Sequence, residues 1–137
     1  MALPEEDIKN LLDDGGFLDS WVDQRGTLHA KPVTQVGMLI EQELECDERC
    51  VMIRKSGGSG ADEYLRNPII SIYMMGTISD AHLIIAERIG EMLDYVLDNY
   101  KSGCTIGATV QGDIEGPYLM ASGRPAYEFN IQTTVER

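Results

Sequence analysis

The chain has 137 residues, of which 43% are hydrophobic and 25% are charged, and this balance excludes a disordered polypeptide. Its 11 Lys and Arg face 23 Asp and Glu, and the formal charge of −12 opposes binding to a phosphate backbone. The length fits one domain spanning residues 1–137. The composition therefore predicts one acidic globular domain that does not bind nucleic acid.

The first residues show no basic segment followed by an apolar one, so we expect no secretory signal. No run approaches the roughly 18 apolar residues that would span a bilayer, so we expect no membrane association. Three cysteines, Cys46, Cys50 and Cys104, are an odd number, which favours reduced thiols over a disulfide framework. These features predict a protein made in a cytoplasm.

The chain opens with a predicted short helix. Pro4 suits a first helical turn, and Ile8, Leu11 and Leu12 have helical spacing before an Asp-Asp-Gly-Gly stop at residues 13–16. Residues 17–48 follow no clear period. There, Arg25-Gly26 indicates a turn and Pro32 blocks a continuing helix. Residues 36–44 could form a strand or one or two helical turns, and the sequence weakly favours extended structure.

The middle of the chain predicts a strand, a loop and a second strand. Residues 50–53 are β-prone, the glycine-rich residues 56–60 are typical of a flexible loop, and residues 69–75 are almost continuously apolar. A strand of that composition is expected to be buried on both faces. We expect the two strands to pair antiparallel across the glycine loop.

A long amphipathic helix is predicted over residues 79–100, with Ser79 as its N-cap and a stripe of apolar residues. The stripe contains Ile85, Ile89, Met92, Leu93 and Val96. Residues 105–111 predict a strand, residues 112–117 a turn, and the alternation over residues 126–135 a half-buried strand. The fold class is therefore α+β, with a mostly antiparallel sheet of four to five strands, one long helix packed on a face and a short amino-terminal helix.

Motifs for metal or cofactor chemistry are weak, so we expect neither a metal nor a cofactor. A phosphate-binding loop needs Gly-Lys-Ser or Gly-Lys-Thr before a helix, whereas Asp62 and Glu63 follow the glycines here. The CxxxC spacing of Cys46 and Cys50, with Cys104 and the two histidines as further ligands, departs from the usual CxxC knuckle. Buried thiols are the better interpretation.

Motifs for catalysis are also weak, and the sequence predicts no enzyme. His29 and His82 lack a local partner pattern, and neither GxSxG nor HExxH occurs. Asp113 and Glu115 flank a glycine-rich turn and form the one pair of carboxylates worth testing. A solvated turn explains them better, because nothing near them in the sequence would raise a pKa.

The order of elements resembles the lambda-type tail terminator proteins of bacteriophages with long non-contractile tails. The resemblance covers residues 49–137 and rests on the runs VMIRKSGG at 51–58, NPIISI at 67–72 and Asp80-Ala81, then Gly116-Pro117 and GRPAYEF at 123–129. It implies a structural virion protein, a hexameric ring that caps the tail tube, stops tube polymerisation and joins the head connector. Its place would be the head-proximal end of the virion tail, with DNA passing through the lumen without specific binding.

A ring of this kind needs a head-to-tail contact that closes by rotation. We expect that contact, and contacts with partner proteins, in the glycine loop and in the turn from residue 112 to 124. The candidate residues are Gly57, Gly58, Asp62, Glu63, Tyr64, Asp113, Glu115, Tyr118 and Arg124. Two alternatives stay open: a head completion or neck subunit, and a small ligand-binding or enzymatic domain that uses the acidic turn near Asp113.

Overall fold

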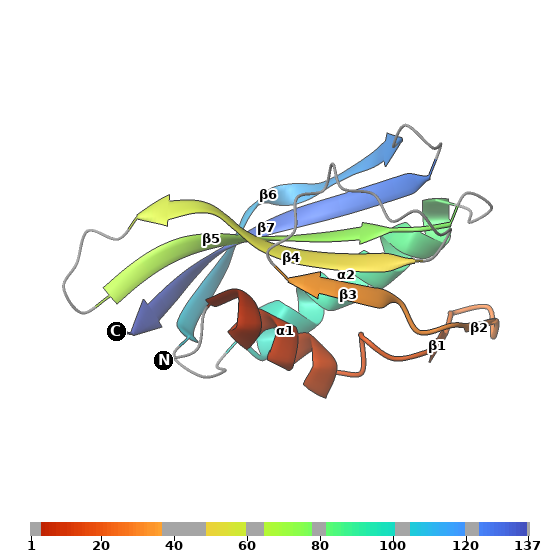
Figure 1. Ribbon diagram of the computed structural model, residues 1–137, viewed down its shortest axis with the longest axis horizontal. Coiled ribbons are helices and arrows are strands. Elements are labelled where there is room, and N and C mark those ends of the chain that lie inside the picture. The colour runs from red at the N-terminus through yellow and green to blue at the C-terminus, as the bar shows by residue number, and fades with distance from the viewer. Residues whose placement is uncertain are drawn as a thin grey trace.

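The computed structural model describes residues 4–36, 49–59, 65–77, 82–100, 105–119 and 124–136. Five strands form one sheet in the order β3-β4-β5-β7-β6, and both helices lie on the same side of it (Figure 1). A separate two-stranded hairpin joins β1 and β2. In chain order the elements are α1 (Pro4–Asp14), β1 (Trp21–Val22), β2 (Leu28–His29), β3 (Val33–Val36), β4 (Cys50–Ser59), β5 (Leu65–Met75), α2 (His82–Asp98), β6 (Thr105–Leu119) and β7 (Pro125–Glu136).

The predicted α+β class with mostly antiparallel strands is confirmed. Strand β4 pairs antiparallel with β5, β5 with β7, and β7 with β6, whereas β3 runs parallel to β4 and makes the sheet mixed. The antiparallel pairing of β4 with β5 follows the prediction, with Ile53 opposite Ile72. Strand β7 lies between β5 and β6, so the carboxyl-terminal strand occupies an interior position in the sheet.

The main core joins the helices to the sheet. Of the predicted α2 stripe, Ile85, Ile89, Met92 and Val96 are fully buried, and Leu93 is partly buried against the same core. These residues form one cluster with residues of α1, β4, β5 and β7. The strand contribution includes Val51, Ile53, Ile70, Ile72, Met74, Phe129 and Ile131.

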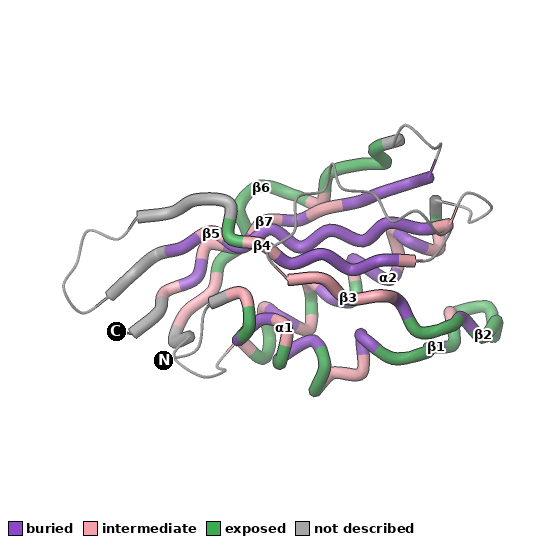
Figure 2. The backbone as a smooth tube through the Cα atoms, viewed as in Figure 1, coloured by how far each residue is buried: buried purple, intermediate pink, exposed green. Residues whose placement is uncertain are grey.

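The central strand β5 is buried on both faces, as expected from its continuous apolar sequence (Figure 2). Alternate residues Ile70, Ile72 and Met74 belong to the main core, whereas Tyr73 and Met75 belong to a second cluster. The other members of that second cluster are Cys50, Met52 and Ala126. Packing on both sides therefore fixes the register of the middle of the sheet.

The amino-terminal helix α1 forms as predicted. Its first turn carries three acidic residues, which favour the positive end of the helix dipole. Ile8 and Leu12 are fully buried in the main core, and the chain leaves the helix through Gly16, whose φ of 79° suits glycine.

The prediction of a flexible glycine loop over residues 56–60 is wrong for residues 56–59, which belong to β4. Gly57 pairs with Ile69 and Gly58 with Pro68, after a register shift between Lys55 and Gly57. The physical reason is that β5 begins at Leu65, earlier than expected, and so supplies hydrogen-bonding partners along the glycine segment. Residue 60 lies outside the described residues.

The predicted turn over residues 112–117 is also wrong, because β6 continues through it to Leu119. Register shifts between Gln111 and Glu115 and again before Tyr118 absorb the extra residues as irregularities in the ladder with β7. Gly112 and Gly116 have φ of 78° and 138°, a backbone geometry that favours glycine. Turn-type residues here bend a strand instead of ending it.

Residues 17–36, which had no clear period, contain the β1–β2 hairpin and β3. The turn predicted at Arg25-Gly26 connects β1 to β2, and Gly26 donates its backbone N–H to the Asp23 carbonyl over 3.0 Å. Val36 is the last residue of β3, and the remainder of the extended segment expected over residues 36–44 lies outside the described residues. Among the described helices, none has the length and apolar character needed to cross a membrane.

The burial pattern of α2 predicts that truncating two of its aliphatic side chains to alanine changes the free energy of unfolding by unequal amounts. Ile89→Ala removes a fully buried side chain and should lower the free energy of unfolding by about 2–5 kcal/mol. Leu83→Ala, at a position that is 53% exposed, should change it by less than about 0.5 kcal/mol. Urea titration of both variants and the parent chain measures the difference, and equal losses would contradict the burial pattern.

Candidate functional site

A chain of polar side chains crosses four strands on the sheet face that lies away from the main core, and we call it the polar ladder. Arg54 on β4 donates a hydrogen bond to the Tyr73 hydroxyl on β5 over 3.2 Å and lies 5.4 Å from the centre of that ring. Tyr73 hydrogen-bonds Glu128 on β7. Tyr118 on β6 donates to Glu115 over 2.5 Å and approaches Glu128 at 3.2 Å.

Strand register explains why these side chains meet. Tyr73 lies directly opposite Glu128, and Glu128 lies opposite Glu115. Opposed residues of antiparallel strands point to the same face, so one row of side chains forms across the sheet. The same face carries Ser71 hydrogen-bonded to Asn130, which it faces across β5 and β7.

The polar ladder keeps the hydroxyls of its tyrosines protonated, as hydrogen-bond donors. The hydrogen bond to Glu115 raises the pKa of Tyr118 far above its ordinary value, and burial, then Glu128, raises the pKa of Tyr73. Hydroxyls that stay protonated in this way serve as hydrogen-bond donors to the neighbouring carboxylates. The arrangement suits recognition, because it fixes carboxylate oxygens beside a Tyr118 ring that is 40% exposed.

Three of the predicted interface residues come together on β6. Asp113 is exposed, and its Oδ1 accepts the backbone N–H of Ile114 over 2.7 Å. Glu115 and Tyr118 are members of the polar ladder and are also exposed. This outer strand therefore presents two carboxylates and an aromatic ring along one edge of the sheet.

The other predicted residues lie elsewhere. Arg124 is 3% exposed, and its Nε donates to the Gly76 carbonyl over 2.8 Å, so it joins the start of β7 to the end of β5. Gly57 and Gly58 lie within β4 at the end paired with the start of β5. Residues 62–64, which include Asp62, Glu63 and Tyr64, lie outside the described residues.

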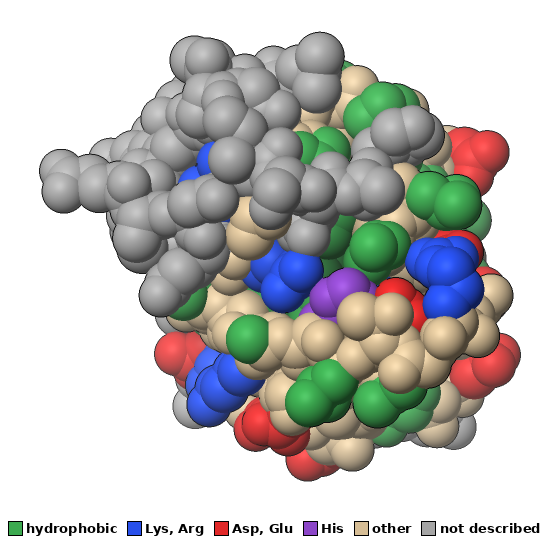
Figure 3. Space-filling model, turned by 90° about the vertical axis from the view of Figure 1, so that its right-hand side faces the viewer, with side chains coloured by type: hydrophobic (Ala, Val, Ile, Leu, Met, Phe, Trp, Pro, Cys, Tyr) green, Lys and Arg blue, Asp and Glu red, His purple; other side chains and the backbone are tan. Residues whose placement is uncertain are grey.

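The β1–β2 hairpin contains a hydrogen-bonded Asp23–His29 side-chain pair that the sequence interpretation missed. His29 Nε2 lies 2.8 Å from Oδ2 of Asp23, and the two side chains are 6% and 4% exposed. The His29 ring stacks on Trp21, its cross-strand partner, with ring centres 4.8 Å apart. On the face shown in Figure 3, a histidine lies among acidic and basic side chains. The signal available in the sequence was an aspartate six residues before the histidine, on the other side of the Arg25-Gly26 turn.

Two arginines hold the hairpin against α2. Arg88 on α2 lies 4.6 Å from the ring centre of Phe17 and 4.8 Å from that of Trp21. Burial lowers the pKa of Arg88, although Glu91 opposes that shift from 3.5 Å. Arg25 at the hairpin turn forms a bidentate pair with Glu87 of α2 at 3.0 and 3.1 Å.

The cysteine and histidine side chains were the residues considered for a metal site. No group of three His, Cys, Asp or Glu side chains there is arranged to hold a metal ion. Cys50 is a fully buried thiol at the start of β4, as expected, and Cys46 and Cys104 lie outside the described residues. Both His29 and Asp23 are engaged with each other.

Acid should weaken the hairpin through Asp23. The hydrogen bond from His29, then that from the Thr27 backbone, lowers the pKa of Asp23 from 3.8 to about 2. A lowered folded-state pKa means that this carboxylate stabilises the fold above about pH 4 and loses that effect as pH falls toward 2. The stability difference between the parent chain and Asp23→Asn should therefore shrink over this range in urea titrations. Exposed Asp19→Asn serves as control, and a constant difference would contradict the role of Asp23.

Two glycines of β6 should respond differently to a methyl group. A Cβ at Gly116 would lie 2.7 Å from Cδ1 of Tyr127 and 2.8 Å from the Ala126 carbonyl oxygen, whereas one at Gly112 meets nothing within 4 Å. Both have positive φ, so Gly112→Ala should cost about 1–2 kcal/mol and Gly116→Ala about 2–5 kcal/mol. Urea titration separates the two costs, and a larger loss at Gly112 would contradict the packing of β6 on β7.

A comparison with known families identifies the chain. The model of a family described as phage tail termination protein matches residues 1–137, so the match includes the hairpin, the core and the polar ladder. No curated protein matches the chain. The family is a structural one and its members belong to the phage tail, which agrees with the resemblance in the order of the elements. Because the match spans the full sequence, the chain belongs to the phage tail termination protein family.

Proposed function

We propose that the chain is a single-domain tail terminator that caps the tail tube as a hexameric ring, stops tube polymerisation and forms the joint to the head connector. The full-length match to the tail termination family carries this proposal. In this role the protein occupies the head-proximal end of the virion tail. Its partners are further copies of itself, the tail tube protein and the connector, and its task is structural instead of enzymatic.

The exposed strand β6 is the proposed surface for assembly. It is an edge of the five-stranded sheet, and its residues 109–113 and 115–118 are exposed (Figure 2). An edge strand offers unpaired backbone groups that another chain can approach. The irregular pairing around Gly112 and Gly116 distorts this edge, so side chains such as Glu115 and Tyr118 are better suited to make the contact than a continued sheet.

The charge of the chain suits a ring through which DNA moves. Six copies at −12 each create a strongly negative field. Acidic walls remove the counterion-release gain that drives non-specific DNA binding. We therefore propose that DNA passes the lumen without specific contacts.

The proposal predicts a ring and a limit on tube length. Native mass measured by light scattering, at two salt concentrations and with polymerised tail tube protein added, should show a hexamer alone or on tube ends. Added protein should also stop tube growth, which electron microscopy of tube lengths records. A monomer or dimer that ignores the tube under all conditions would overturn the proposal. A ring that binds the connector and leaves tube growth unchanged would indicate a neck subunit instead.

The exchange of two exposed carboxylates separates assembly from a ligand site. Asp113→Asn with Glu115→Gln keeps the shape of both side chains and removes their charges. If β6 served a small ligand or cation, the variant would lose that binding and assemble as the parent does. The structural role predicts the reverse: the variant assembles more weakly and loses no small ligand. Light scattering measures assembly, a thermal-shift screen measures ligand binding, and together they distinguish the two roles.

A further inference from the structure

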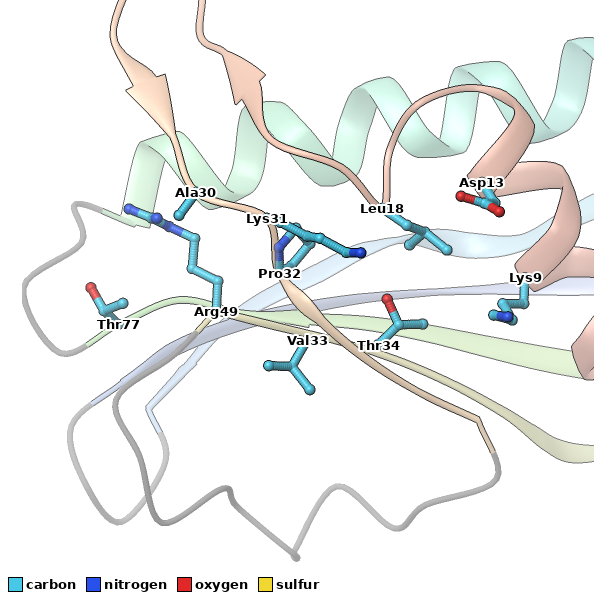
Figure 4. Close-up of a pocket in the computed structure, with 10 residues that line it drawn as sticks. All are labelled: Lys9, Asp13, Leu18, Ala30, Lys31, Pro32, Val33, Thr34, Arg49 and Thr77. Atoms are coloured by element: carbon cyan, nitrogen blue, oxygen red, sulfur yellow. The ribbon is translucent and has the colours of Figure 1, made fainter.

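A basic pocket of about 690 Å³ opens at the edge of the sheet opposite to β6. Its walls come from α1, from the segment that leads into β3, and from the residues just before β4 and just after β5 (Figure 4). In Figure 4 the Lys31 side chain extends from the start of β3 toward Leu18 and the α1 side of the pocket. The residues that carry charge are Lys9, Asp13, Lys31 and Arg49.

The charge of this pocket is opposite to that of the chain. Three of the 11 Lys and Arg residues line it, together with a single carboxylate, although acidic residues outnumber basic ones by 23 to 11 overall. Lys9 and Lys31 make no ion pair in the part of the chain that the structure describes. Arg49 differs, because its guanidinium lies 5.5 Å from the ring centre of Trp21.

The opposite edge of the sheet carries negative charge, which complements the positive charge of the pocket. Strand β6 contains Asp113 and Glu115 and no Lys or Arg anywhere between Thr105 and Leu119. Strand β3, which lines the basic pocket through Val33 and Thr34, is the first strand in the sheet order and β6 is the last. One chain therefore presents a basic hollow at one edge and an acidic strand at the other.

We propose that the basic pocket receives the Asp113 and Glu115 carboxylates of a second copy of this chain. The inference rests on the proposed ring and names the contact that closes it. A head-to-tail ring needs two different surfaces on each copy, and the opposite edges of this sheet supply them. Copies of net charge −12 repel one another, and a local pairing of opposite charges offsets that repulsion at the contact.

The contact is tested by reversing charge on each side separately. Lys9→Glu with Lys31→Glu, and Asp113→Lys with Glu115→Lys, should each weaken ring formation at least about tenfold in sedimentation velocity, because like charges then face each other. Lys55→Glu is the control, since Lys55 is exposed on β4 and lies outside the pocket. Arg49 is left intact because of its contact with Trp21. Circular dichroism and urea midpoints show that each variant folds.

Mixing the two reversed variants gives the sharpest result. In an alternating ring, each glutamate pocket meets a lysine edge and each lysine pocket meets an acidic edge, so every contact is attractive again. Equal amounts of the two variants should therefore restore rings that neither forms alone. Raised salt should weaken the restored and the parent rings alike, because screening at physiological ionic strength acts over about 8 Å.

Failure of this contact differs from failure of the proposed function. If the parent chain forms rings and both reversed variants do as well, or if the mixture stays dissociated, the pocket does not hold the neighbouring edge. In that case the proposed ring is retained and only the proposed contact between the pocket and β6 is rejected. If the parent chain forms no ring even on tube ends, both proposals fall. If the pocket variant keeps its ring and instead loses binding to duplex DNA in a shift assay, the pocket is a phosphate site and the proposal is overturned.

Discussion

The core cluster shared by α2 and the inner faces of β4, β5 and β7 is the constraint on which the remainder of the molecule depends. Four of the five residues of its α2 stripe are fully buried, and the opposing strand residues alternate with those that face the other way. A slip of one residue in β5 or β7 would turn apolar side chains away from the helix. The register that places Tyr73, Glu128 and Glu115 in one row is thus a by-product of packing on the opposite face.

The sequence predicted those parts of the fold in which burial repeats with a regular period. Helices α1 and α2, strand β5 and strand β7 have apolar residues at helical, continuous or alternating spacing, and all four appear, although β5 begins at Leu65, four residues earlier than expected. The errors fall where glycine dominates, at residues 56–59 and 112–117. A single sequence shows that glycine permits a turn. Whether the segment turns or continues as a strand depends on the neighbouring strand that pairs with it. The short hairpin around Asp23 carried no period at all.

The candidate surface was predictable only in part. Asp113, Glu115 and Tyr118 belong to the segment 112–124 that the sequence predicts as a contact turn, and they lie together on β6. Their link to Arg54 and Tyr73 depends on pairing between strands more than forty residues apart in the sequence, which no local pattern encodes. Arg124, the last residue of that predicted segment, is instead buried, and its guanidinium donates to a carbonyl at the end of β5.

Trp21 is the only tryptophan in the chain, and its surroundings make it a built-in optical reporter. Trp21 is 7% exposed, its indole stacks on the His29 ring, and its ring centre lies 4.8 Å from the guanidinium of Arg88 and 5.5 Å from that of Arg49. Emission from a single indole is unambiguous, and its wavelength follows the polarity and charge around it. Since Arg49 also lines the basic pocket, binding that displaces its guanidinium would change the surroundings of this indole and therefore its emission, without an added label.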